Sequence, residues 1–300
     1  MRLLLSLLSF LTIHHIFGAQ IPPGQLTQIT SDTYATSKGP KFHLYVPRNL
    51  SKHPALVVAI HYCTGTGPAY FKNSPYGKLA EQYGFIAIYP TSPHNGTCWD
   101  LSSRKTLTHN GGSDSGDIVG MVKWLLGRYS EVDQKRVYMV GTSSGAMMVN
   151  VLAGAYPDLF AAGIAYSGVP AGCFVSQQDL VNAWNSTCAQ GKAVTSPKEW
   201  ATVVSSMNPG YQGPRPKMLI YHGSKDAAIS PQNYEETTKQ WSGVFGYDYG
   251  NGIKNAESDK YVSTTWGPNL MGMLAKDGTH DLKQLGNFDM AWFGLSAIPT

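Results

Sequence analysis

The sequence predicts an α/β fold in which a mostly parallel sheet lies between two layers of helices. Several short runs are continuously apolar and rich in Val and Ile, which is typical of strands buried on both faces. Helical patterns lie between these runs, and this alternation favours parallel strands with helices on both sides of the sheet. Hydrophobic residues make up 42% of the 300 and charged residues 14%, which suits one domain with a large core.

The elements follow one another in a regular order. Side chains alternate in residues 41–46 before Pro47, which predicts an early strand. Buried strands are expected at 55–61, 85–89, 137–140, 161–166 and 218–221. Helices are expected at 76–83, 117–129, 144–156 and 232–245. A hairpin-like stretch at 262–274 and a last helix near 287–294 complete the pattern.

One segment interrupts this alternation. Residues 169–215 contain no clear strand, and Gly, Pro, Ser, Trp and two cysteines are concentrated there. Long excursions inside a compact fold usually serve function, so we expect this one over the active-site edge of a single domain, residues 20–300. No linker rich in Ser, Thr and Pro leads to an accessory module.

Residues 1–19 have the features of a secretory signal peptide. Arg2 supplies the positive start, and the apolar run 3–13 is about half as long as a membrane span. Cleavage is expected near Gly18 or Ala19, and no second stretch of spanning length follows, which predicts a secreted protein without a membrane anchor. Export also makes three sequons candidate glycosylation sites, which begin at Asn49, Asn95 and Asn185.

The cysteines fit an oxidising compartment, where an even number indicates disulfides. The four are Cys63, Cys98, Cys173 and Cys188. Three connectivities are possible, and proximity favours Cys173–Cys188, which leaves Cys63–Cys98. No Cys-x-x-Cys pair or His/Cys cluster has the spacing of metal ligands, so no metal is expected.

The net charge is small, at +4, and no cluster of five or more Lys and Arg occurs. This argues against nucleic acid and anionic membrane surfaces as partners. A neutral or weakly charged substrate fits better.

The candidate nucleophile is Ser143, in the run Gly141-Thr-Ser143-Ser144-Gly145. The pattern Gly-x-Ser-x-Gly alone is a weak signal in a chain with 32 glycines, but here it joins a buried strand to a helix, as the nucleophile elbow requires. The hydroxyl would project at the helix N-terminus, where amide dipoles favour developing negative charge. The sequence therefore predicts an α/β-hydrolase, a three-layer sandwich with a serine nucleophile.

A serine hydroxyl needs a base, and in this fold the triad follows the order Ser, acid, His. Only two of the nine histidines, His222 and His280, follow Ser143. His222 ends an apolar strand, which favours a structural role. His280 lies in a polar loop, where it can approach the serine from another part of the chain, and is the expected base.

The expected acid is Asp226, five residues beyond the apolar run 218–221. Its carboxylate would hold the tautomer of His280 and stabilise the imidazolium that forms. Asp248 and Asp259 are rivals, but both lie in a polar stretch with no strand before it.

The oxyanion hole needs two backbone amides. One is expected from Ser144, the residue after the nucleophile. The other is expected from Cys63, in the loop after the strand 55–61, with Thr64 as the alternative. A disulfide from Cys63 to Cys98 would stiffen this loop, although it is equally explained as a staple of the fold.

Longer stretches extend these motifs: His61-Tyr-Cys-Thr-Gly-Thr-Gly, Cys98-Trp-Asp, Leu107-Thr-His-Asn-Gly-Gly, Gly141-Thr-Ser-Ser-Gly-Ala-Met-Met, Ile164-Ala-Tyr-Ser-Gly-Val-Pro-Ala-Gly-Cys, Trp184-Asn-Ser-Thr-Cys-Ala-Gln-Gly and Tyr221-His-Gly-Ser-Lys-Asp. Together they resemble the fungal acetylxylan esterases of carbohydrate esterase family one, a group that also includes feruloyl esterases and polyhydroxybutyrate depolymerase-like enzymes. The similarity covers most of the mature chain.

The resemblance implies removal of acetyl groups from acetylated xylan or xylo-oligosaccharides outside the cell, without a metal or other cofactor. It supports Ser143, Asp226 and His280 as the triad. It also suggests that Trp184 contacts the sugar. Without the resemblance, its spacing would favour a place in the hydrophobic core. The loop around His280 departs from the relatives, which tend to have a hydrophobic residue before the histidine and a proline soon after.

We expect a monomer without a carbohydrate-binding module. The alternative activity is that of a feruloyl esterase acting on hydroxycinnamoyl-xylan, whose pocket must hold a phenolic ring. An inactive carbohydrate-binding protein on the same fold is disfavoured because all three triad members are present.

Overall fold

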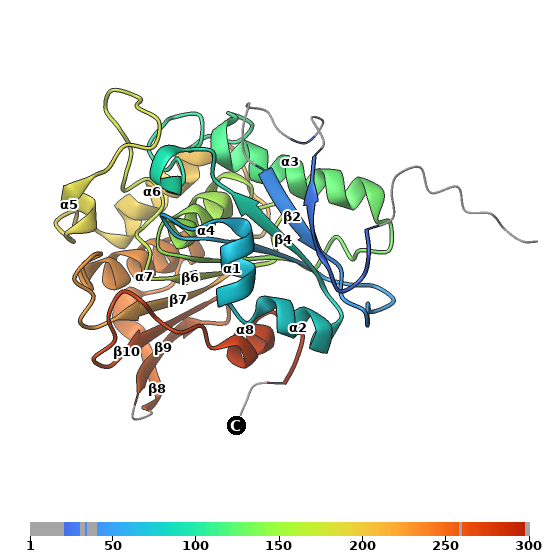
Figure 1. Ribbon diagram of the computed structural model, residues 1–300. Coiled ribbons are helices and arrows are strands. Elements are labelled where there is room, and N and C mark those ends of the chain that lie inside the picture. Colours follow the sequence, from blue (N-terminus) through green and yellow to red (C-terminus); the bar gives the residue numbers. More distant parts are fainter. Residues whose placement is uncertain (1–20, 31–33, 35–40, 258–259, 298–300) are drawn as a thin grey trace, which may run out of the picture.

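The computed structural model describes residues 21–30, 34, 41–257 and 260–297. The predicted signal peptide, residues 1–19, lies outside the described residues. In the ranges that are described, none of the helices has the length and apolar character needed to cross a bilayer. A twisted sheet runs through the molecule, with helices packed on both of its faces (Figure 1).

The sheet contains ten strands within the described residues. In spatial order they are β1 (Leu26–Ile29), β2 (Lys41–Tyr45), β4 (Ile86–Thr91), β3 (Leu56–Ile60), β5 (Val137–Thr142), β6 (Ala162–Tyr166), β7 (Lys217–Gly223), β10 (Leu270–Ala275), β9 (Tyr261–Gly267) and β8 (Ile253–Glu257). All neighbours from β4 to β10 are parallel, whereas the outer pairs at both edges are antiparallel. The mostly parallel sheet confirms the predicted fold class.

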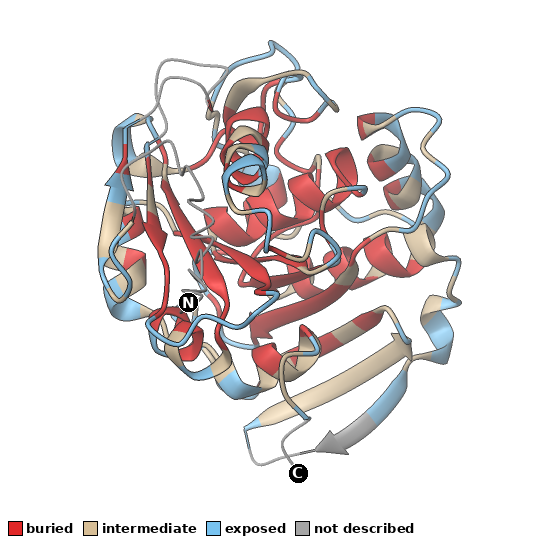
Figure 2. Ribbon diagram, turned by 90° about the vertical axis from the view of Figure 1, so that its right-hand side faces the viewer, coloured by how far each residue is buried: buried red, intermediate tan, exposed pale blue. Residues whose placement is uncertain are grey.

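The helices form two layers. One face is covered by α3 (Ser113–Arg128), α4 (Ser144–Ala155), α6 (Pro197–Met207) and α7 (Gln232–Phe245), and the other by α1 (Gly67–Asn73), α2 (Tyr76–Tyr83) and α8 (Gly286–Trp292). Because successive strand residues point to opposite faces, Val58 packs with the first layer and Val57 with the second. Figure 2 shows this core, with the central strands and α4 almost wholly buried.

The predicted elements are all present, with ends that differ by a few residues. Five strands and α-helices were not predicted from the sequence: β1, β8, α1, α6 and the short helix at Ser186–Ala189. The presence of β8 also corrects the expectation that no strand comes before Asp259. The start of α6 has a readable signal, since Ser196 and Glu199 form a capping box ahead of a proline at the first helical position. This helix packs against α7 and α4, so the second half of the 169–215 excursion joins a helical layer, while its first half contains only the short helix α5 (Ser186–Ala189).

Candidate active site

Ser143 lies at a strained turn between β5 and α4. Its φ of 55° is in the left-handed region, which non-glycine residues rarely occupy. The turn also needs glycine on both sides. A Cβ on Gly141 would overlap the backbone of Gly145, and one on Gly145 would overlap the carbonyl oxygen of Ile60 at the end of β3. The small residues therefore let the elbow pack directly on the sheet and project the hydroxyl outward.

The structure brings the three predicted triad residues into one hydrogen-bonded chain. The distance from His280 Nε2 to Ser143 Oγ is 2.9 Å, and that from His280 Nδ1 to Asp226 Oδ2 is 2.7 Å. An ionised carboxylate only accepts hydrogen bonds, so the imidazole proton is on Nδ1. His280 Nε2 is then free to accept the proton of the Ser143 hydroxyl, which is the arrangement of a nucleophile with its base and orienting acid.

The order of the strands explains why residues so far apart in sequence meet. Ser143 follows β5, Asp226 follows β7 and His280 follows β10, and these strands lie close together in the order β5, β6, β7, β10. The carboxyl ends of parallel strands meet at one edge of the sheet. The Asp226 and His280 loops also contact each other directly, because the amide of Lys225 donates to the carbonyl oxygen of Gly278 at 2.8 Å.

Asp226 is buried but well supplied with hydrogen-bond donors. The amides of Ala228 and Ile229 donate to its Oδ1 at 2.9 and 2.8 Å. His222 Nε2 lies 3.2 Å from Oδ2, the oxygen that also accepts from His280. Burial alone would raise the pKa of Asp226, but hydrogen bonds from His222, His280 and Ile229 outweigh it and hold the pKa well below the usual range. The carboxylate therefore stays ionised at neutral pH.

The rival acid Asp248 has no hydrogen bond to the triad among the described residues. Asp248 begins a short 3-10 turn, η2 (Tyr249–Asn251), and its side chain accepts from the amide of Gly250. Asp259 lies outside the described residues.

Two amides are available where the oxyanion would form. Ser144 is the first residue of α4, so its amide has no partner inside the helix. In the β3–α1 loop, the amide of Thr64 donates to the carbonyl oxygen of Gly96 at 2.7 Å, which excludes the alternative donor. No hydrogen bond engages the amide of Cys63 within the described residues, so this amide remains the second candidate.

A network of contacts holds the loop that contains Cys63. His61 Nδ1 donates to the carbonyl oxygen of Tyr62 at 2.7 Å, while its Nε2 accepts from the amide of Ser92 at 3.1 Å. Burial lowers the pKa of His61 to about 4, although the bond to Tyr62 opposes this, so the ring is neutral as these contacts require. The Trp99 indole donates to the carbonyl oxygen of His61 at 2.8 Å. These contacts fix the direction of the loop before any substrate arrives.

The disulfides join Cys63 to Cys98 and Cys173 to Cys188, the pairing expected from the sequence. The first joins the Cys63 loop to the segment that follows β4. It therefore acts on the same loop as the contacts of His61.

Trp184 lies in the excursion and is 60% exposed. Its ring packs edge-on against Phe174, with centroids 5.2 Å apart. The exposure excludes the core role that spacing alone had favoured.

The three sequons differ in accessibility. Asn49 and Asn95 are exposed. The Asn185 side chain is already used, because it accepts from the amide of Cys188 at 3.0 Å and donates to the carbonyl oxygen of Cys173 at 3.2 Å.

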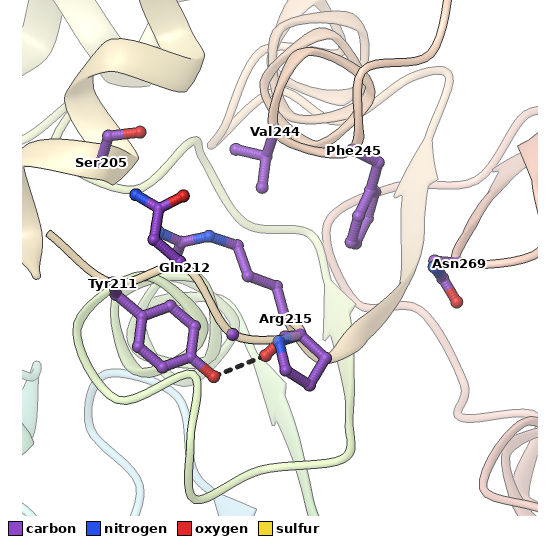
Figure 3. A pocket seen from close by; sticks show the side chains of 9 residues that line it. Ser205, Tyr211, Gln212, Arg215, Val244, Phe245 and Asn269 are labelled. Carbon is purple, nitrogen blue, oxygen red and sulfur yellow. Dashed lines mark hydrogen bonds between the residues drawn. The ribbon is translucent and has the colours of Figure 1, made fainter.

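A pocket of about 460 Å³ lies away from the triad. Figure 3 shows Tyr211 and Arg215 on one side of it and Val244, Phe245 and Asn269 on the other. Arg215 and Asn269 precede β7 and β10, so the pocket is at the opposite edge of the sheet from the triad. The Arg215 guanidinium donates to the carbonyl oxygen of Gly154 at the end of α4, which explains its place there. Among the described residues no group of three or more His, Cys, Asp and Glu is arranged to hold a metal ion.

No role was predicted from the sequence for Tyr166 and Ser167, although both lie between the nucleophile and the base. Ser143 N donates to the carbonyl oxygen of Tyr166 at 2.8 Å, and Ser167 Oγ donates to the carbonyl oxygen of His280 at 3.0 Å. Their position at the end of a buried strand was the available signal, because all such ends meet at the active-site edge.

The chain is similar to known proteins over most of its length. Residues 41–262 match the model of the family described as esterase PHB depolymerase. The chain is 54% identical over 280 residues to acetylxylan esterase A of Emericella nidulans, covering 92% of this chain and 91% of that protein. It is 55% identical over 276 residues to acetylxylan esterase A of Aspergillus ficuum, covering 91% and 90%.

The chain is also similar to solved structures. The acetyl xylan esterase from Aspergillus awamori superposes with a TM-score of 0.88 at 51% identity, covering 91% of this chain and all of that one. A poly(aspartic acid) hydrolase from Sphingomonas is only 15% identical, with a TM-score of 0.52 over 93% of this chain and 99% of the other, and shows a shared fold alone.

Proposed function

The chain belongs to the esterase PHB depolymerase family and groups there with the fungal acetylxylan esterases, and we propose that it removes acetyl groups from acetylated xylan. It is a carboxylic ester hydrolase. The observation that supports the proposal most is the chain Ser143–His280–Asp226, with contacts of 2.9 and 2.7 Å, in a protein more than half identical to acetylxylan esterases.

The first half of the reaction acetylates the enzyme. Ser143 Oγ attacks the acetyl carbonyl carbon while His280 Nε2 accepts the hydroxyl proton. The carbonyl oxygen becomes an oxyanion, which the amides of Cys63 and Ser144 stabilise. His280 then protonates the leaving sugar hydroxyl, and an acetyl group remains on Ser143. Asp226 stays ionised and stabilises the imidazolium throughout.

The second half reverses these roles with water. His280 removes a proton from a water molecule, whose oxygen attacks the acetyl-serine, and the same two amides receive the second oxyanion. Acetate leaves as Ser143 recovers its proton. The rigid Cys63 loop matters in both halves, because preorganised donors need no rearrangement as charge develops.

The proposed reaction takes place outside the cell. Residues 1–19 act as a signal peptide, and the mature protein works as a monomer on xylan or xylo-oligosaccharides without a membrane or nucleic-acid partner. Exposed Trp184 provides a ring on which a sugar can stack. Asn49 and Asn95 are better placed for glycans than Asn185, whose amide is engaged in two hydrogen bonds.

The test is product release from acetylated xylan and from methyl ferulate, side by side, with Ser143→Ala as the blank. We expect acetate from xylan, little ferulate, and a loss of several orders of magnitude in the blank, on the order of 10⁵ to 10⁶ in kcat. Turnover like that of the wild type in Ser143→Ala would reject the triad. Rapid ferulate release would keep the triad and replace acetyl by feruloyl as the substrate group.

A further inference from the structure

The loop that holds His280 is attached to the end of β6 at two points. This base loop comprises residues 276–285, between β10 and α8. Ser167 Oγ donates to the carbonyl oxygen of His280 at 3.0 Å, and the amide of Leu285 donates to the Tyr166 hydroxyl at 2.9 Å. A third contact reaches the end of β5, where Gln284 Nε2 donates to Thr142 Oγ1 at 3.1 Å. The loop has no regular secondary structure, and its N-terminal part is held separately, by the bond from the amide of Lys225 to Gly278 and the bond from the amide of Asp277 to Ser224 Oγ. The contacts with β5 and β6 therefore hold the part of the loop from His280 onward.

The Tyr166 hydroxyl is oriented by Asp289. It donates to Asp289 Oδ1 at 2.8 Å, and Tyr76 donates to Oδ2 at 2.8 Å. Tyr221, whose ring stacks on that of Tyr166, makes a longer contact of 3.4 Å to Oδ1. An ionised carboxylate only accepts, so the proton of Tyr166 points at Asp289 and an oxygen lone pair is left for the amide of Leu285.

The same strand end also supports the nucleophile. Ser143 N donates to the carbonyl oxygen of Tyr166 at 2.8 Å. Ser167 has a φ of 57° and is fully buried, a conformation that persists only where its surroundings enforce it. Residues 166 and 167 therefore contact the backbones of both Ser143 and His280.

We propose that Tyr166, oriented by Asp289, is a positioning residue for His280: its hydroxyl fixes the C-terminal end of the base loop and so keeps Nε2 within reach of Ser143 Oγ. The proposal rests on the proposed function, because it assumes that His280 is the base. Tyr166 is fully buried, and the strong hydrogen bonds of its hydroxyl go to Asp289 and to the amide of Leu285, not to a triad residue. The contribution of its hydroxyl, as distinct from that of its backbone carbonyl, is therefore to the geometry of the base.

The test compares Tyr166→Phe with Tyr76→Phe. Each substitution removes one hydroxyl from a fully buried ring, and each removes a 2.8 Å bond to Asp289. Only Tyr166→Phe also leaves the amide of Leu285 without its acceptor. The readouts are kcat and KM for 4-nitrophenyl acetate, together with the melting temperature.

We expect a larger loss of melting temperature in Tyr166→Phe, because the amide of Leu285 loses its acceptor, and we expect the kinetics to differ as well. In Tyr166→Phe, kcat should fall by about tenfold or more, since displacements near 1 Å at a reacting group cost up to about 100-fold. KM should stay within about twofold, because ground-state binding is not affected. In Tyr76→Phe, both constants should stay within about twofold of wild type. Equal values of kcat in the two variants would overturn the proposal.

Ser167→Ala gives an independent check, because it removes the other contact of β6 with the base loop. The double variant Tyr166→Phe/Ser167→Ala should lose less activity than the product of the single losses, since both bonds hold one segment. Strict multiplication of the two effects would mean that they act separately and would contradict the proposal.

A parallel assay of Ser143→Ala distinguishes failure of the proposed triad from failure of the positioning role of Tyr166 alone. Activity that survives in Ser143→Ala rejects the triad and with it the positioning role. An inactive Ser143→Ala, combined with equal kcat values in Tyr166→Phe and Tyr76→Phe, rejects the positioning role alone.

Discussion

Asp226 and Asp289 are both buried, at 4% and 0% exposure, yet their pKa values shift in opposite directions. Burial raises the pKa of both carboxyls. For Asp226, the bonds from two histidines and a backbone amide outweigh burial and lower its pKa below the usual range. For Asp289, the tyrosine hydroxyls offset burial only in part, and its pKa rises to about 6.

The difference lies in the donors. Asp226 accepts from backbone amides held by the turn after β7 and from His280, whose charge during the reaction favours the carboxylate. Asp289 accepts from the hydroxyls of Tyr76, Tyr166 and Tyr221, which are neutral and can rotate. A triad acid must remain ionised to stabilise an imidazolium, so of these two buried aspartates only Asp226 is suited to that role.

Between the two aspartates, the largest expected effect is that of Asp226→Asn on catalysis. The amide can donate from its nitrogen, so His280 can lose the tautomer in which Nε2 accepts the serine proton. We expect kcat for 4-nitrophenyl acetate to fall by about 10³ to 10⁴-fold. The matched variant Asp289→Asn, which changes a buried carboxyl in the same way, should lose about tenfold. Losses of equal size would remove the functional distinction between the two aspartates.

The next effect is on stability. The pH dependence of the free energy of unfolding should have opposite signs for the two aspartates. The folded pKa of Asp289, about 6, exceeds its ordinary 3.8, so its contribution is full below about pH 4 and is lost as pH rises through about 6. Asparagine cannot ionise. The free energy of unfolding of wild type, relative to Asp289→Asn, should therefore fall by about 2 kcal/mol between about pH 4 and pH 7.

Asp226→Asn should show the opposite slope, because the folded pKa of Asp226 is lowered. Its contribution is present above about pH 4 and is lost as pH falls below that value. Urea unfolding of the three proteins at several pH values measures both slopes. Parallel curves for the two variants would show that the two carboxyls do not differ in the way the structure indicates.

The two aspartates also show what the sequence can predict. Asp226 follows an apolar strand that precedes the candidate base, so strand order and position were enough to select it, and the structure brings it within 2.7 Å of His280. Asp289 lies in a short C-terminal helix, where an acidic residue reads as exposed. Its burial depends on tyrosines from α2, β6 and β7, a convergence that exists only in three dimensions.

The fold likewise has features that the local sequence specifies and features that depend on contacts between distant segments. Buried parallel strands were predicted because continuous apolar runs specify them locally, and the sheet confirms them. β1 was missed because only Ile29 of its four residues is buried, so it has little apolar pattern. The loop geometry that leaves the amide of Cys63 rather than Thr64 unengaged depends on Gly96, which lies beyond the next strand.

The smallest expected effect tests how many donors Asp226 needs. His222 Nε2 lies 3.0 Å from the carbonyl oxygen of Ile229 and 3.2 Å from Asp226 Oδ2, so its N–H is shared between two acceptors. His222→Phe removes that donor and leaves His280 and two amides on the carboxylate. A shared bond to a charged group is worth about 1.5 kcal/mol, which corresponds to about a tenfold loss of kcat.

His222→Gln can place an N–H near the same oxygen and should therefore recover most of this loss of kcat. Packing damage caused by replacing the imidazole ring would instead lower kcat in both variants. Kinetics of wild type, His222→Phe and His222→Gln make the comparison, with melting temperatures to detect general damage. If His222→Phe matched the loss in Asp226→Asn, the carboxylate would depend on this one donor rather than on the set. If His222→Phe were as active as wild type, the backbone amides and His280 would be enough to hold the Asp226 carboxylate for catalysis. His222 would then contribute as little to kcat as the hydroxyls around Asp289.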